Sequence, residues 1–191
     1  MHPTIGESRQ DRFARQRFPR WLVVIYLGVT LAACAPAPEP VTAIVVEHVV
    51  DGDTIVVSFG GRAHETVRLL GIDTPETVDP SRPEQCFGKQ ASDFLRSLIP
   101  AGTTVVIERD VEARDHFGRL LGYVFRAEDH LFVNQVLLEH GFADLSIYEP
   151  NSTYETRLNA AVVAARTRNI GLWNACGGAD VAIDPAPVTL D

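Results

Sequence analysis

Three short strand-like segments separated by turn signals, the first of them rich in valine, restrict the fold of this 191-residue chain more than any other feature. Residues 41–50 and 53–59 form the first two, and Gly60-Gly61 follows them. Adjacent glycines tolerate the positive φ angles that a two-residue hairpin turn needs. A third segment runs from about residue 62 to residue 72. The sequence therefore predicts a strand, then a β-hairpin, then a proline-containing loop.

Helix and strand patterns alternate along the rest of the chain. Apolar residues recur at helical spacing from Ala91, from Val133, and after the capping box Ser152-x-x-Glu155, so three helices are expected. Residues 103–109 and about 119–126 have the composition of strands. The predicted fold class is therefore mainly β with α (α+β), and the predicted architecture is a five-stranded OB-type barrel with three helices. Periodicity alone leaves closure of the barrel open.

The N-terminus differs in character from the predicted barrel. Residues 1–20 contain five arginines, and a short apolar run from Trp21 to Ala33 follows. This run is too short to span a bilayer comfortably as a helix, and its layout is typical of a signal peptide. We therefore predict that residues 1–33 are removed on export and take no part in the fold.

A cysteine stands directly after this apolar run. The stretch Leu31-Ala32-Ala33-Cys34 resembles the lipobox of bacterial lipoproteins, in which the cysteine thiol takes up a diacylglycerol group. The alternative is an ordinary signal peptide with a chance cysteine. Lipidation of Cys34 would make a membrane a partner of the chain and place it in the bacterial cell envelope, lipid-anchored and facing outside the cytoplasm. Residues 34–40, rich in proline, would then be a lipid-attached linker.

The charge balance argues against one class of nucleic-acid binder. Residues 1–33 carry five arginines and two acidic residues, so their removal leaves 12 basic and 23 acidic residues and a net charge of −11. Phosphate contacts supply most non-specific affinity for nucleic acid, so an acidic chain is poorly suited to coat it. The balance still permits an enzyme with a local basic site and a bound cation.

Cys86 and Cys176 remain once Cys34 is lipidated. Two cysteines in an exported chain favour a disulfide, because the compartment is oxidising, and two free buried thiols are the alternative. A Cys86–Cys176 bond would tie the end of the fold to the loop before the first helix. Residues 177–191 have no pattern and are expected to be a disordered tail, so the folded domain is predicted to span residues 41–176.

Three short segments concentrate polar residues that a core would not accommodate. They are Asp51-Gly52-Asp53-Thr54, the stretch from Arg68 to Thr77, and Asp115-His116-Phe117-Gly118-Arg119. Their carboxylates suit a hard divalent cation or a water-activating base, and the planar donor forks of their arginines suit a phosphate. Together these groups are the ones that hydrolysis of a phosphodiester needs.

Taken singly, each segment has a simpler interpretation. Asp-Gly-Asp-Thr is an ordinary turn signal, and Asp51 is expected to form that turn. The Asp-Thr-Pro-Glu stretch is compatible with a helix cap or a loop, and Arg119 with a surface charge. Arg68 is harder to dismiss, because it interrupts an apolar strand, where an unpaired cation is costly.

In their order and spacing, the three segments resemble the staphylococcal nuclease (thermonuclease) family. The similarity covers about residues 41–176, and one such match would be weak, whereas the ordered set is specific. The chain is therefore identified as an exported lipoprotein member of this family. Further stretches match in order, namely Gly88-Lys89-x-Ala91, Val133-Asn134, Gly141-Phe142-Ala143, Pro150-Asn151 and Gly171-Leu172-Trp173.

The resemblance implies a calcium-dependent endonuclease that hydrolyses phosphodiester bonds of DNA and RNA. Its partners would be single-stranded or locally melted DNA and RNA, with no protein partner and a monomeric state. The Ca²⁺ ligands would be the carboxylates of Asp53 and Asp73 and the backbone carbonyl of Thr74. Two protein carboxylates make a sparse calcium site, so waters and substrate would complete the coordination and binding would be weak.

The catalytic residues implied by the resemblance are Glu76, Arg68 and Arg119. Glu76 would act on the attacking water as general base or orienter, and the arginines would stabilise the phosphate in the transition state. Substrate binding is implied for Tyr148 and Phe117, but a serine replaces the tyrosine two residues before Tyr148, and Phe117 lacks the hydroxyl of the expected tyrosine. Stacking is worth roughly 1–3 kcal/mol per base, so affinity and base preference are the properties most affected.

A second function class is compatible with the fold alone, namely a non-catalytic OB-fold binding module on an envelope lipoprotein. A third is a structural envelope lipoprotein, which would show no activity and no effect of metal. Arg68, Glu76 and Arg119 separate these classes, because a pure binder has no need of all three.

Overall fold

The computed structural model describes residues 43–61, 63–77 and 84–183. The predicted signal peptide, the linker and Cys34 lie outside these residues. Within the described part of the chain, no helix combines the length and the apolar character that crossing a bilayer requires.

Five strands form a closed barrel in the order β1-β2-β3-β6-β5. β1 pairs antiparallel with both β2 and β5, and β3 pairs parallel with β6, which completes the circle. The predicted five-stranded barrel is confirmed, and the closure that periodicity left open is present. The strands are β1 (Ile44–Val49), β2 (Thr54–Phe59), β3 (Ala63–Leu69), β5 (Thr104–Glu108) and β6 (Leu120–Arg126).

The hairpin between β2 and β3 turns where the sequence predicts. Gly60 and Gly61 have φ angles of 60° and 71°, a region that side chains with a Cβ rarely adopt. The strands on either side pair in register, so that Thr54 lies opposite Arg68 at the far end of the hairpin. This register brings the Asp53 turn and Arg68 to the same end of the barrel.

A small two-stranded sheet was not predicted. β4 (Gly71–Asp73) pairs antiparallel with β7 (Asp144–Ser146), and Asp73 lies opposite Asp144. Each strand has only three residues, too few for an alternating pattern to be visible in the sequence. The pairing fixes the backbone that carries Asp73 directly after β3.

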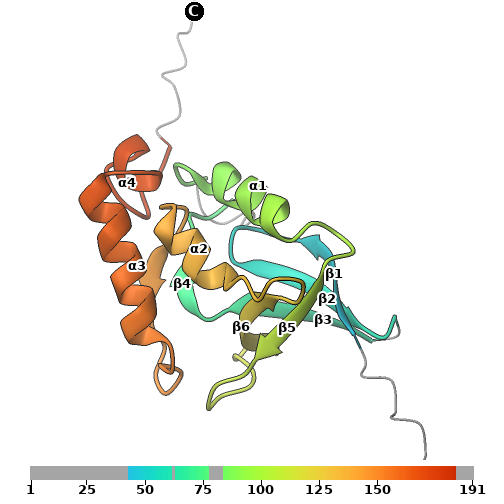
Figure 1. Cartoon of the computed structure of the whole chain (residues 1–191). Helices are drawn as coiled ribbons and strands as arrows, with labels where there is room; N and C mark the ends of the chain where they lie inside the picture. Colours follow the sequence, from blue (N-terminus) through green and yellow to red (C-terminus); the bar gives the residue numbers. More distant parts are fainter. Residues whose placement is uncertain (1–42, 62, 78–83, 184–191) are drawn as a thin grey trace, which may run out of the picture. The chain divides into compact units, whose positions relative to one another are not determined.

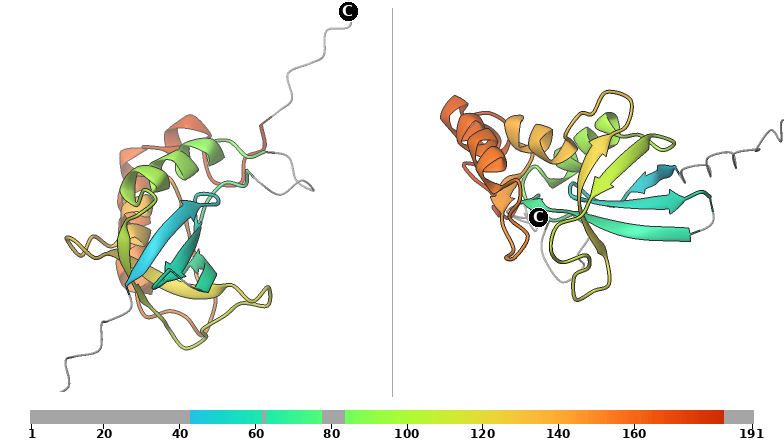
Figure 2. Two further views of the ribbon diagram at one scale, coloured as in Figure 1. Left: turned by 90° about the vertical axis from the view of Figure 1, so that its right-hand side faces the viewer. Right: turned by 60° about the horizontal axis from the view of Figure 1, so that its bottom comes forward.

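Helices cover one side of the barrel (Figure 1), and the two further views in Figure 2 agree. α2 contacts β6 and also α3, so it lies between the barrel and the last long helix. The described residues hold four helices, one more than expected, because a one-turn helix follows the third. They are α1 (Gly88–Leu98), α2 (Val133–Glu139), α3 (Glu155–Arg168) and α4 (Leu172–Ala175).

The start of α3 differs from the prediction. The helix begins at Glu155 and has no side-chain cap. The backbone carbonyl of Ser152, and not its hydroxyl, accepts the Glu155 N–H at 3.0 Å. Ser152 therefore belongs to a turn that precedes the helix, and the predicted capping box was wrong.

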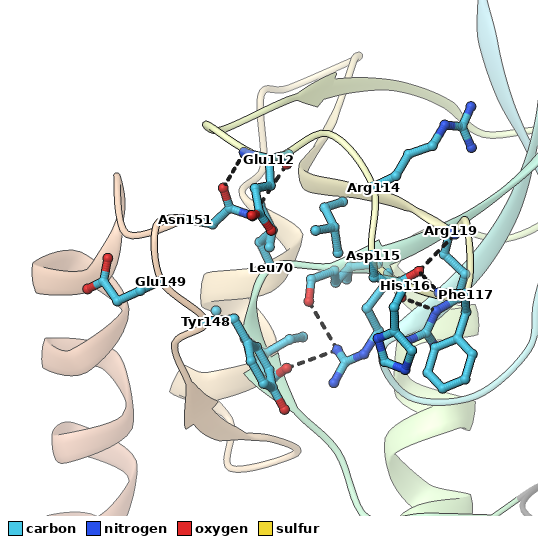
Figure 3. A pocket seen from close by; sticks show the side chains of 15 residues that line it. Leu70, Glu112, Arg114, Asp115, His116, Phe117, Arg119, Tyr148, Glu149 and Asn151 are labelled. Atoms are coloured by element: carbon cyan, nitrogen blue, oxygen red, sulfur yellow. Dashed lines mark hydrogen bonds and ion pairs between the residues drawn. The ribbon is translucent and has the colours of Figure 1, made fainter.

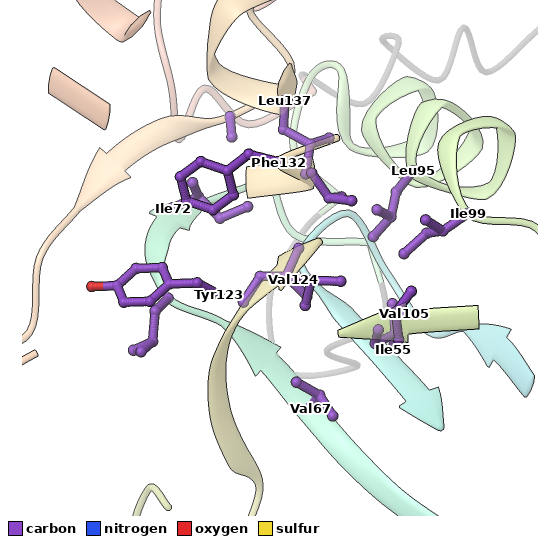
Figure 4. Close-up of a cluster of buried hydrophobic side chains, with 14 of the residues drawn as sticks. Ile55, Val67, Ile72, Leu95, Ile99, Val105, Tyr123, Val124, Phe132 and Leu137 are labelled. Atoms are coloured by element: carbon purple, nitrogen blue, oxygen red, sulfur yellow. The ribbon is translucent and has the colours of Figure 1, made fainter. Parts of the chain in front are cut away.

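One hydrophobic core joins the barrel interior to the helices. Figure 4 shows Ile55, Val67 and Val124 of the barrel together with Leu95 of α1 and Ile99 directly after α1, and all five are fully buried. Burial of an aliphatic side chain stabilises a fold by about 1.5–3 kcal/mol. This core, more than any polar contact, holds the strands that carry the polar residues.

The predicted disordered tail is partly held in the fold. Cys86 and Cys176 form a disulfide with a Cα–Cα distance of 6.0 Å. The backbone of residues 181–183 then pairs with residues 84–86 through the bridge between Gln85 and Ala182. The expectation of disorder was therefore wrong for this segment, because composition does not show a pairing that a disulfide supports. Residues 184–191 lie outside the described part of the chain.

Candidate active site

The turn between β1 and β2 buries a carboxylate. Oδ2 of Asp53 accepts hydrogen bonds from the backbone N–H of Thr74 at 2.9 Å and from its hydroxyl at 3.0 Å. Oδ1 of Asp53 accepts the hydroxyl of Thr54 at 3.0 Å. These donors compensate the buried charge, which would otherwise be costly.

Gly52 allows this turn to approach Thr74. A Cβ at Gly52 would lie 2.6 Å from the Thr74 hydroxyl oxygen and 2.9 Å from the Cβ of Ala91. Asp51 has the turn-forming position expected of it, since its Oδ1 accepts the Asp53 N–H at 3.1 Å. Burial, followed by the charge of Asp53, raises the pKa of Asp51 to about 6. The Asp-Gly-Asp turn thus places the Asp53 carboxylate against Thr74, and the Asp51 carboxyl group accepts the Asp53 N–H.

Arg68 joins the two carboxylates for which the family resemblance implies a metal-binding role. Its Nη2 lies 2.7 Å from Oδ1 of Asp73 and 3.1 Å from Oδ2 of Asp53. Its Nη1 donates to the backbone carbonyls of Leu69 at 3.0 Å and Ile72 at 2.9 Å. The cation that interrupts β3 is therefore paired with charges and with backbone acceptors, which explains how an apolar strand accommodates it.

Negative charge accumulates around Asp73. Burial raises the pKa of Asp73 to about 6, and the negative charges of Asp53, Asp180 and Glu76 also raise it, against the lowering effect of Arg68. A carboxyl group in this environment is stabilised as a carboxylate by an added cation. The pocket therefore has an excess of acidic groups over the positive charge that Arg68 supplies.

Glu76 follows β4 in a loop that is held by its backbone. The Glu76 N–H donates to Oε1 of Gln85 at 2.6 Å, and the Glu76 carbonyl accepts the Gln85 N–H at 2.9 Å. Oε1 of Glu76 accepts the backbone N–H of Thr77 at 2.9 Å. The sequence analysis did not single out Gln85, because the residues around it do not distinguish it from a surface glutamine.

Arg119 is presented by the loop between β5 and β6. Its Nε donates to Oδ2 of Asp115 at 2.6 Å, and its backbone N–H donates to Oδ1 of Asp115 at 2.9 Å. Burial by itself would raise the pKa of Asp115. The hydrogen bonds and the positive charge of Arg119 outweigh burial, so the pKa of Asp115 lies below its usual range. The Arg119 guanidinium carbon also lies 5.3 Å from the centre of the Phe117 ring. Asp115 was not predicted to orient Arg119, although a turn-forming aspartate four residues before an arginine is a usable signal.

A cavity of about 280 Å³ brings the predicted catalytic and metal-binding residues together. An adjoining cavity of about 430 Å³ shares Arg68, Phe117 and Arg119 with it and includes Tyr148. Figure 3 shows Tyr148 on one side of this second cavity and His116 and Phe117 on the other. The first cavity is lined by Asp51, Asp53, Arg68, Asp73, Thr74, Pro75, Glu76, Phe117 and Arg119.

The donor groups suit a hard cation. The described residues contain no group of three or more His, Cys, Asp and Glu side chains that would form a metal site by themselves. However, the carboxylates of Asp53 and Asp73 both lie within 3.1 Å of one nitrogen of Arg68, so they converge on a single positive charge. Carboxylate oxygens are hard ligands, which Ca²⁺ and Mg²⁺ prefer. The residues therefore fit a divalent cation bound by few protein ligands.

Fold and site together define a class of protein: a small closed barrel with a pocket that combines converging carboxylates with two arginines, suited to phosphate esters. Residues 66–175 match the family model described as staphylococcal nuclease homologue. The chain belongs to the staphylococcal nuclease family.

Individual relatives agree with this membership. The chain is 39% identical over 128 residues to the thermonuclease of Staphylococcus intermedius, covering 67% of this chain and 74% of that protein. It is 36% identical over 126 residues to the thermonuclease of Staphylococcus hyicus, covering 66% and 72%. It is also 35% identical over 135 residues to the SPbeta prophage-derived endonuclease YokF of Bacillus subtilis, covering 70% and 45%.

Proposed function

We propose that this chain is a calcium-dependent endonuclease that hydrolyses phosphodiester bonds of DNA and RNA. The observation that carries the proposal is the single cavity lined by Asp53, Asp73, Glu76, Arg68 and Arg119. Family membership and relatives named thermonuclease and endonuclease support a hydrolase of nucleic-acid esters. The calcium requirement follows the family resemblance, and the chemistry of the pocket supports a divalent cation and the individual roles.

The two arginines bind the phosphate. Arg68 and Arg119 line both cavities, so a phosphate at the junction meets two guanidinium groups. Guanidinium donors stabilise the charge that grows on the phosphate oxygens as phosphorus becomes pentacoordinate. Asp115 holds Arg119 through two hydrogen bonds, which lowers the entropy lost when the arginine engages the substrate.

Glu76 acts on the attacking water. Its carboxylate lines the same cavity as the two arginines and accepts the proton of a water aligned with phosphorus, or orients that water. The carboxylates of Asp53 and Asp73 and the carbonyl of Thr74 would hold a Ca²⁺ ion, which when bound supplies Lewis-acid stabilisation of a phosphate oxygen. The acidic pocket needs this charge, because otherwise its carboxylates repel the phosphate.

The second cavity binds a nucleobase. Tyr148 and Phe117 are exposed aromatic side chains at its edge, and Phe117 is shared with the first cavity. Bases that are free to unstack pack on exposed aromatic rings without sequence preference. The preferred substrate is therefore single-stranded or locally melted DNA or RNA, held with its phosphate next to the two arginines.

An assay of single-stranded DNA cleavage tests the mechanism. The purified chain is incubated with calcium or with a chelator, and Glu76→Ala and Arg119→Ala are compared with it. We expect each substitution to lower the rate by about 10³-fold or more, because positioning and charge stabilisation dominate phosphoryl transfer. Glu128→Ala and Arg96→Ala, each outside the two cavities, serve as matched controls. Rates like those of the unmodified chain in both site variants would overturn the mechanism, and equal rates with the chelator would remove the metal requirement.

The chain is also proposed to be a lipid-anchored protein of the bacterial cell envelope, facing outside the cytoplasm. The Leu31-Ala32-Ala33-Cys34 stretch after the apolar run supports this localisation. Cys34→Ser should release the protein from the membrane fraction, since no diacylglycerol can attach, whereas Ala35→Ser should leave it there. Persistent membrane association of Cys34→Ser would contradict lipidation.

A further inference from the structure

The segment 84–86 contacts the Glu76 backbone on one side. The Gln85 N–H donates to the Glu76 carbonyl at 2.9 Å, and the Gln85 side-chain oxygen accepts the Glu76 N–H at 2.6 Å. Both backbone polar groups of Glu76 are thus held by a single residue. A pair of hydrogen bonds to one residue restricts rotation of the Glu76 peptide groups, and so fixes the direction in which its side chain leaves the backbone.

The other side of the same segment contacts the end of the chain. The Cys86 N–H donates to the Val181 carbonyl at 2.7 Å, and the Ile183 N–H donates to the Glu84 carbonyl at 3.0 Å. These bonds alternate with those of Gln85, as in a strand that has a neighbour on each side. Residues 84–86 are therefore the middle of three backbone segments, between Glu76 and residues 181–183.

Covalent and steric contacts hold this arrangement in place. The Cys86–Cys176 disulfide attaches the terminal segment to the middle one across 90 residues of sequence. On the opposite side, a Cβ at Gly88 would lie 2.4 Å from Cγ2 of Thr77 and 2.8 Å from the Pro75 carbonyl oxygen. The start of α1 therefore packs directly on residues 75–77. The negative charge of Asp180, in the terminal segment, raises the pKa of the Asp73 carboxyl group.

We propose that Gln85 is a positioning residue for Glu76, and that the disulfide-anchored segment 176–183 keeps Gln85 in place. The proposal rests on the proposed function, in which Glu76 acts on the attacking water. A base that misses its water by about 1 Å loses on the order of 100-fold in rate. Gln85 lines neither of the two cavities, so its effect passes through the Glu76 backbone.

Gln85→Met tests this role, because methionine keeps the length of the side chain and removes the acceptor for the Glu76 N–H. Gln90→Met, at an exposed position of α1, is the matched control. Steady-state kinetics on single-stranded DNA with calcium should show kcat lowered by about tenfold or more in Gln85→Met, with KM changed by less than about threefold. Gln85→Glu keeps an oxygen acceptor and should retain most of the kcat.

Amide hydrogen exchange gives a second measurement that does not depend on activity. In Gln85→Met the Glu76 amide should exchange about tenfold faster, because its acceptor is lost, while Gln90→Met leaves it unchanged. The double variant Cys86→Ser/Cys176→Ser should speed amide exchange at positions 183 and 86, and to a smaller extent at Glu76. It should also lower kcat, as Gln85→Met does. This double variant keeps the test open if Gln85→Met fails to fold.

The outcomes separate the two proposals. An active enzyme whose kcat is unchanged in folded Gln85→Met, or whose Glu76 amide keeps its slow exchange, overturns the positioning role and leaves the endonuclease proposal intact. An unmodified chain without nuclease activity overturns the endonuclease proposal. In that case the exchange rate of the Glu76 amide still decides whether Gln85 holds this backbone.

Discussion

The pocket consists of two halves that are built differently. In the strand half, Asp53 and Thr74 are only 6% and 8% exposed, whereas Phe117 and Tyr148 in the loop half are 71% and 65% exposed. The strand half comprises Asp53 before β2, Arg68 on β3, Asp73 at the end of β4 and Thr74 directly after it. The loop half comprises Asp115, Phe117 and Arg119 between β5 and β6, and Tyr148 between β7 and α3.

The difference separates two tasks. The carboxylates and Arg68 lie on or next to paired strands, where burial and several hydrogen bonds define one arrangement, and Arg119 is instead held in its loop by Asp115. The two aromatic rings proposed to stack on a base lie on exposed loops, where a ring adapts to what it stacks against. Substitutions in the strand half should therefore affect stability as well as activity, and substitutions in the loop half should affect function alone.

The largest expected effect is a loss of cleavage rate when either of the two arginines is replaced. Arg68→Ala and Arg119→Ala should each lower the cleavage rate by about 10³-fold or more, since each removes one of the proposed phosphate contacts. Only Arg68→Ala should also lower the free energy of unfolding, by about 2–4 kcal/mol, because it leaves the carboxylates of Asp53 and Asp73 facing each other without a cation. Urea unfolding without calcium measures this difference. Equal free energies of unfolding of the two variants would show that the ion pairs of Arg68 with Asp53 and Asp73 do not stabilise the fold.

The sequence predicted the parts of the strand half that local patterns reveal. The hairpin at Gly60-Gly61 and the barrel strands follow from valine-rich segments and turn residues, and both are confirmed. Arg68 stood out because a cation is unusual in an apolar strand, and the structure places it against Asp53 and Asp73. The roles of these residues remain predictions, because their positions alone do not establish chemistry.

Long-range pairings were beyond the reach of local patterns. The β4–β7 sheet joins two three-residue strands that are distant in sequence. Asn134 is fully buried, and its side chain accepts the Val124 N–H at 2.9 Å and donates to the Leu70 carbonyl at 2.8 Å. Gln85 and residues 181–183 likewise owe their positions to contacts between separate segments. Composition cannot show such contacts, since any polar residue in a loop has the same local appearance.

The second prediction concerns the exposed rings of the loop half. Phe117→Ala and Tyr148→Ala should each raise KM for single-stranded DNA by about tenfold, because one base loses a stacking surface worth about 1–3 kcal/mol. The free energy of unfolding should change by less than about 0.5 kcal/mol, as for other exposed positions. Tyr148→Phe, which keeps the ring, is the matched control and should bind substrate almost normally. A large loss of stability in either alanine variant would mean that these rings belong to the fold and not to the substrate site.

The smallest expected effect tests how the loop half is attached to the barrel. The carboxylate of Asp110 accepts the Tyr123 hydroxyl at 3.0 Å, the Thr153 N–H at 2.9 Å and the Thr153 hydroxyl at 2.9 Å. Burial by itself would raise the pKa of Asp110. The hydrogen bonds from Thr153, Tyr123 and Val111 outweigh burial, so the pKa of Asp110 lies below its ordinary value of 3.8. The folded state therefore favours the charged carboxylate at the point where the chain leaves β5.

A lowered pKa has a defined consequence for acid stability. Asp110 contributes fully to the free energy of unfolding above its unfolded-state pKa, and this contribution is lost as the pH falls through the folded-state pKa. Asp110→Asn should therefore destabilise the chain by about 1 kcal/mol at about pH 7, and the difference should disappear toward about pH 2, where the native side chain is also uncharged. Urea unfolding at both pH values measures it, with Glu128→Gln as an exposed control. A difference that persists in acid would assign the effect to the geometry of the hydrogen bonds from Thr153 and Tyr123 and not to the charge of the Asp110 carboxylate.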